Sequence, residues 1–76
     1  MDENSNRESF KRLAVKRVNN AIKYIHLVGN LSNRSNYSYS EEDVRKIFDA
    51  IEKEIELCKQ RFDTQAKKRN EFTLDD

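Results

Sequence analysis

Two stretches decide the fold: FKRLAVKRVNNAIKYIHLV, residues 10–28, and VRKIFDAIEKEIELCKQRF, residues 44–62. In each stretch apolar residues recur at spacings of three and four, which places them along one side of an α-helix. An Asn- and Ser-rich segment separates the stretches, and the chain has no proline. The pattern predicts an all-α fold in which two antiparallel helices form a hairpin.

The predicted helices differ in the width of their apolar sides. At 100° per residue, the apolar residues cover an arc of about 180° on the first helix and about 100° on the second. One neighbouring helix covers only a narrow seam, so the first helix needs at least two neighbours. We therefore expect a homodimer in which two hairpins form a four-helix bundle. The first apolar face consists of Phe10, Leu13, Ala14, Val18, Ala21, Ile22, Tyr24, Ile25 and Val28, and the second of Val44, Ile47, Phe48, Ile51, Ile55, Cys58 and Phe62.

The chain is short enough to be a single domain, which we expect to span residues 1–76. Its expected parts are a helix over 7–28, a connector over 29–40, a helix over 41–63 and a polar tail over 64–76. Weak periodicity through Ala66 leaves open that the second helix continues for a few turns past residue 63.

Residues at the expected helix ends are typical of caps. Ser5 or Asn6 is the expected N-cap of the first helix, and Gly29 is expected to end it in a left-handed conformation. Ser40 is the expected N-cap of the second helix, with Asp43 at the position of the acidic partner in a capping box.

The charges nearly balance over the whole chain, with 15 basic and 14 acidic residues and a net charge of +1. They are unevenly distributed, since residues 7–26 carry a net charge of +5 and residues 41–63 a net charge of −3. Two interpretations stay open. The helices attract each other and fix their register, with Arg17 paired to Glu54, or the basic helix meets an anionic partner.

No set of residues has the spacing of a catalytic, metal or cofactor site. Cys58 lies within the second apolar face, where we expect a core thiol, and a lone cysteine forms no intrachain disulfide. His26 lies at the edge of the first apolar face without further metal ligands at suitable spacing. We expect a non-enzymatic cytoplasmic protein that needs no cofactor or metal and neither spans a membrane nor carries a secretory signal.

Two surfaces are candidates for binding. Arg34, Tyr37 and Tyr39 in the connector are of the types that often anchor protein interfaces, although they also suit a purely structural turn. A basic stripe opposite the first apolar face is either a solvated surface or a contact for a nucleic acid or an acidic protein surface. It consists of Arg12, Lys16, Asn19 and Lys23. We expect an interaction module that binds an unidentified protein, with a small nucleic-acid-binding regulator as the alternative.

The segment GNLSNRSNYSYSEEDVRKIFDAIEKEIE, with FKRLAVKRVNNAIK upstream, resembles a group of small uncharacterised helical proteins encoded by bacterial genomes and their plasmids or phages. The resemblance covers about residues 9–62. It implies no activity and no site residues, but an origin on a mobile element favours a regulatory or anti-defence role.

Overall fold

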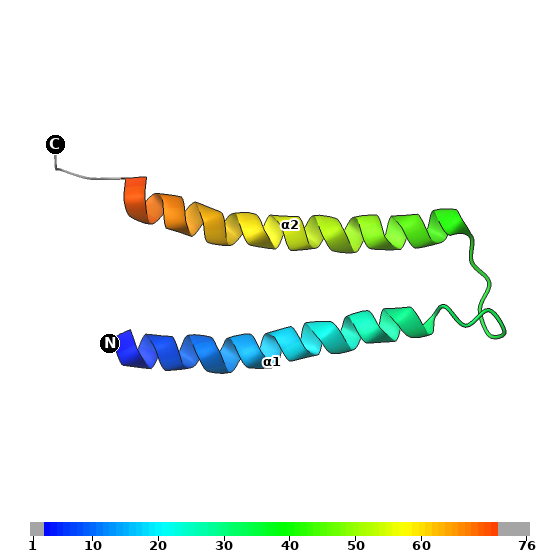
Figure 1. Ribbon diagram of the computed structural model, residues 1–76, viewed down its shortest axis with the longest axis horizontal. Coiled ribbons are helices and arrows are strands. Elements are labelled where there is room, and N and C mark those ends of the chain that lie inside the picture. Colours follow the sequence, from blue (N-terminus) through cyan, green and yellow to red (C-terminus); the bar gives the residue numbers. More distant parts are fainter. Residues whose placement is uncertain (1–2, 72–76) are drawn as a thin grey trace. The chain divides into compact units, whose positions relative to one another are not determined.

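The computed structural model describes residues 3–71, and the side chains of residues 4–66. This part of the chain contains two helices and no strand, which confirms the all-α prediction (Figure 1). Helix α1 spans Glu3–Asn30 and helix α2 spans Glu41–Glu71. The chain divides into two units, Met1–Ser38 and Tyr39–Asp76, and we describe each by itself.

Helix α1 begins four residues before the predicted start at residue 7. Ser5 and Asn6 therefore lie inside its first turns, and the prediction that one of them is the N-cap is wrong. The polar residues that precede Phe10 join the helix because a helical turn needs no apolar side of its own. The helix begins at Glu3, and an acidic residue type is favourable at the positive end of a helix.

The C-terminal end of α1 differs from the prediction as well. Gly29 belongs to the helix, which runs to Asn30 instead of residue 28, and no described residue has a positive φ angle. Tight turns close the helix: the N–H of Leu31 donates to the carbonyl of Val28, and that of Ser32 to the carbonyl of Gly29, both at 3.0 Å. The predicted left-handed glycine is thus wrong, because these i→i+3 bonds already satisfy the terminal carbonyls.

Asn33 organises the connector. Its Oδ1 accepts hydrogen bonds from the backbone N–H of Ser35 at 3.0 Å and from the Ser35 hydroxyl at 2.7 Å. Its carbonyl accepts from the N–H groups of Asn36 at 3.1 Å and Tyr37 at 3.0 Å. Asparagine thus supplies turn-forming bonds by both side chain and backbone, so this part of the connector has a defined shape.

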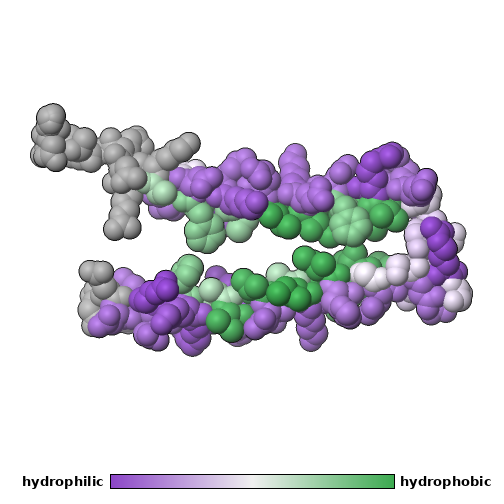
Figure 2. All heavy atoms as spheres, in the orientation of Figure 1, coloured by the Kyte–Doolittle hydropathy of each residue, from purple (hydrophilic) through white to green (hydrophobic). Residues whose placement is uncertain are grey.

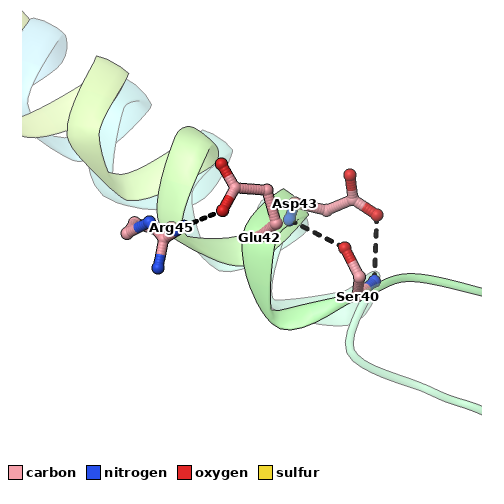
Figure 3. A network of polar contacts seen from close by, with 4 residues as sticks. All are labelled: Ser40, Glu42, Asp43 and Arg45. Atoms are coloured by element: carbon pink, nitrogen blue, oxygen red, sulfur yellow. Dashed lines mark hydrogen bonds and ion pairs between the residues drawn. The ribbon is translucent and has the colours of Figure 1, made fainter.

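The start of α2 is a reciprocal capping box (Figure 3). The Ser40 N–H donates to Asp43 Oδ2 at 2.9 Å, and the Asp43 N–H donates to Ser40 Oγ at 3.1 Å. Bonds from the backbone N–H and hydroxyl of Ser40, together with the charge of Lys46, hold the pKa of Asp43 below its ordinary value. The predicted cap is confirmed, with aspartate in the place usually taken by glutamate or glutamine. Glu42 and Arg45 form an ion pair one turn into the helix.

The C-terminal end of α2 lies at Glu71, eight residues beyond the predicted end at residue 63. Most of the predicted polar tail is therefore helical, and residues 72–76 lie outside the described part of the chain. The extension, TQAKKRNE, lacks an apolar period but contains good helix formers. Its cationic residues also suit the negative end of a helix. Helix propensity and favourable charge therefore account for the helix over residues 64–71, where the apolar pattern has ended.

Candidate functional site

The first apolar face lies open along α1. Only Leu13, Ala14 and Val28 in it are half-buried, and no residue whose side chain the structure describes is fully buried. Ile22 is 59% exposed, and apart from Leu13 and Val28 the other large apolar residues of this face are exposed as well. In Figure 2, hydrophobic side chains gather along one side of α1 and hydrophilic ones along the other. This side of the helix is a continuous surface without a cover in its own unit.

On α1, two exposed apolar residues were missed by the sequence analysis. Val15 and Leu27 lie just outside the two edges of the first apolar face. With them, the apolar side chains of α1 span an arc of about 240° at 100° per residue. Their signal was present in the sequence, but both positions lie beyond the contiguous arc. Because this arc is wider than the predicted one, a single neighbouring helix covers an even smaller part of the apolar side of α1.

The second apolar face on α2 is also open. Val44 and Ile51 are half-buried, whereas Phe48 and Ile55 are exposed. Cys58 is exposed too in this single chain, and its place in a core stays a prediction. The physical reason is that a single helix cannot cover its own apolar side. Any burial of Cys58 requires another helix.

Tyr39 and Val44 show what local packing does achieve. Both are half-buried at the start of α2, where the sequence places them as a hydrophobic staple across the N-cap. The one other half-buried side chain described on α2 is Ile51. Local contacts therefore fix the start of the helix and leave the rest of its apolar face open.

The basic stripe is exposed along the polar side of α1. Among the described side chains, no acidic group lies within ion-pair distance of Arg12, Lys16 or Lys23. Lys11, which lies outside the stripe, has Glu8 at 3.9 Å. Three uncompensated cations with Asn19 between them can attract an anionic surface, although such stripes also occur on solvated helices.

The connector residues do not form one site. Arg34 and Tyr37 belong to the unit that ends at Ser38, and both are exposed, with Tyr37 at 49%. Tyr39 begins the other unit and is half-buried against the start of α2. The turn built on Asn33 holds Arg34 and Tyr37, so these two remain the candidates for contact. The pairing of Arg17 with Glu54 stays a prediction, since these residues also lie in different units.

The described residues contain no group of three His, Cys, Asp or Glu side chains arranged for a metal ion. His26 is exposed on α1. Over the residues that the structure describes, neither helix has an apolar stretch suited to crossing a membrane. A shallow hollow on α2 is lined by Leu57, Gln60, Arg61, Thr64 and Gln65.

Comparison with known proteins finds no matching family model, curated protein or solved structure.

Proposed function

We propose that this chain is a small, non-enzymatic interaction module of the cytoplasm. Each copy folds as an antiparallel helical hairpin, and two copies join their apolar faces in a four-helix bundle. The bundle binds another protein through the connector, chiefly Arg34 and Tyr37, or through the polar side of α1. The role that we propose for the bundle is regulatory, in a bacterium or one of its mobile elements.

The observation that carries the proposal is the exposure of the two apolar faces. Nine large apolar side chains of these two faces are each at least 36% exposed in the described part of the chain. Monomeric soluble proteins rarely leave contiguous apolar surface of this extent in water, because its burial stabilises by about 25 cal/mol for each Å². The faces therefore need a cover, and α1 needs more than its own hairpin supplies.

A second copy is the simplest source of that cover. Two helices from one chain of 76 residues give a marginal core, and small domains commonly gain stability by oligomerisation. A twofold dimer brings the same apolar faces together twice and adds two helices. Four helices enclose a core in which the wide face of α1 meets two neighbours.

Capture of partners from the cells that encode the protein tests the binding function. We expect the tagged wild-type chain to retain a specific protein after nuclease treatment. An Arg34→Ala/Tyr37→Ala variant should lose that protein, since arginine and tyrosine often dominate interface energies. Asn36→Ala/Ser38→Ala changes neighbouring connector residues and should retain it. Equal retention by both variants would exclude the connector as the binding surface.

A nucleic-acid-binding regulator is the second candidate, supported by the three uncompensated cations of the basic stripe. A dimer displays that stripe twice. Binding should weaken steeply with salt and on Arg12→Glu, Lys16→Glu or Lys23→Glu, because contacts to phosphates release counterions. Gel-shift assays with mixed DNA and RNA at low salt measure it. Absence of a shifted band, together with a captured protein that survives nuclease, favours the first candidate.

A further inference from the structure

The residues of the second apolar face are regularly spaced along the sequence. Six of its members follow one another at intervals of 4, 3, 4, 3 and 4 residues: Val44, Phe48, Ile51, Ile55, Cys58 and Phe62. This is the heptad spacing of a coiled-coil seam, in which successive residues insert between those of a facing helix. Because α2 continues to Glu71, the next seam position, Gln65, is also helical. A facing helix can therefore follow α2 over most of its length.

The charges of α2 are divided between its halves. Residues 41–56 contain seven acidic and three basic residues, a net charge of −4. Residues 57–71 contain five basic and two acidic residues, a net charge of +3. A parallel neighbour of the same sequence brings like charges together, including the three acids of each first turn. An antiparallel copy places each acidic half beside a basic half, so α2 is complementary to itself in that direction.

We propose that α2 lies antiparallel against α2 of a second copy, with Ile55 opposite the partner's Cys58. This inference rests on the proposed dimer and specifies which helices meet in it. The twofold axis then passes between residues 56 and 57, near the middle of Glu41–Glu71, so the two helices overlap almost from end to end. The layers beside the central ones pair Ile51 with the partner's Phe62, and Phe48 with the partner's Gln65.

Residues beside the seam select this register. On one flank Glu52 lies near the partner's Lys59, and on the other Glu54 lies near the partner's Arg61. Opposite charges meet on both flanks, so these pairs favour the same register whichever flank of α2 faces the partner's α2 in a four-helix bundle. All four side chains are exposed on α2 and free to make these contacts. Twofold symmetry forms each attraction twice.

One competing register has more apolar layers. It places Ile51 opposite the partner's Ile55, so that the six apolar seam residues of one helix pair only with the six of the other. Gln65 then lies beyond these six layers. However, it brings Glu52 near the partner's Glu52 and Glu54 near the partner's Glu54. It also places Lys59 near the partner's Arg45. Charge reversal at Lys59 therefore has opposite effects in the two registers, which makes them distinguishable.

The test compares dimer dissociation constants by sedimentation equilibrium. Lys59→Glu/Arg61→Glu should raise the constant about 10-fold or more, because attractive pairs become repulsive. Adding Glu52→Lys/Glu54→Arg restores opposite charges and should return the constant to within about 3-fold of the wild type. Lys46→Glu/Lys53→Glu is the matched control, since it makes the same charge change on the side of α2 away from the seam. We expect about 3-fold change or less for the control.

Each result has a definite consequence. A dimer that tightens on Lys59→Glu/Arg61→Glu, or changes no more than the control, overturns the proposed α2 pairing and leaves the dimer standing. Failure of the fourfold charge exchange to restore binding overturns it too. A wild-type chain that stays monomeric at about 100 μM overturns both the pairing and the proposed bundle. Circular dichroism of each variant shows whether the helices themselves are retained.

Discussion

Replacement of Ile22 by alanine measures how much of the first apolar face another copy covers. Alanine removes three side-chain carbon atoms and preserves the helix. Each carbon is worth about 0.8 kcal/mol on full burial. Ile22 is 59% exposed, so complete burial in the dimer gives about 1.4 kcal/mol per copy. A twofold dimer loses this twice, about 2.8 kcal/mol in all, which raises the dissociation constant about 100-fold.

Isothermal dilution calorimetry determines this constant for the wild-type chain and for Ile22→Ala. Asn19→Ala, in the basic stripe of the same helix, is the control and should leave the constant within about 3-fold of the wild type. Asn19→Ala should also raise the helix propensity of α1 slightly. If Ile22→Ala also changes the constant by less than about 3-fold, the dimer does not bury the first apolar face at this position, and the reasoning fails.

Four further predictions concern the helix ends and the thiol. Ser40→Ala removes one half of the capping box and should cost about 1 kcal/mol, a fall in Tm of about 4–8 °C, whereas Ser38→Ala should leave Tm unchanged. The pKa of Asp43 is lowered in the folded chain, so the ionised carboxylate should stabilise the protein above about pH 4. This stabilisation should be lost as the pH falls through the folded pKa. Thermal scans between about pH 5 and pH 2 should therefore show a steeper fall in Tm for the wild type than for Asp43→Asn. Gly29→Ala should raise the free energy of unfolding by about 0.4–1 kcal/mol in urea titrations, because Gly29 has no positive φ and nothing lies within 4 Å of an added Cβ; a loss of stability would instead support a left-handed stop there. Cys58 should react with a thiol reagent faster as the protein is diluted, because it is exposed in a single chain and covered in the proposed dimer; a rate independent of concentration across the dissociation range would show that the dimer leaves it open.

The start of α2 could be predicted from sequence because the signals there are local. Ser40 and Asp43 are three residues apart, and each bonds the backbone N–H of the other, so no distant residue decides the outcome. The helix begins at Glu41 as expected for that reason. Asn33 acts over a similarly short range, bonding groups two to four residues ahead of it. Its neighbours in the Asn/Ser triplets have the same composition, which is why the sequence alone did not single it out.

The other helix ends were mispredicted because apolar periodicity was taken as the limit of each helix. Such periodicity reports the side of a helix that needs a cover, whereas helix formation also follows from propensity and terminal charge. Glu3 and the extension from residue 64 to Glu71 are helical for the latter reasons. Gly29 was misread because glycine permits a left-handed conformation without requiring one.

The candidate surfaces could be predicted only in part. The sequence located the basic stripe and both apolar faces, since a helix fixes which residues share a side. It could not foresee that Tyr39 lies in a different unit from Arg34 and Tyr37, because that depends on where the connector turns. Val15 and Leu27 on α1 are a different case, because the sequence fixes their positions on the helix and they were missed only since they lie beyond the contiguous apolar arc.

Sedimentation equilibrium of the wild-type chain tests most directly whether a second copy covers the apolar faces. The mass of one chain is 9.1 kDa. We expect the measured mass to rise from this value towards twice it as the concentration increases, with α-helical circular dichroism strengthening over the same range because unpartnered helices are marginal. A mass of 9.1 kDa at every concentration, with full helicity and a sharp thermal transition, would contradict it.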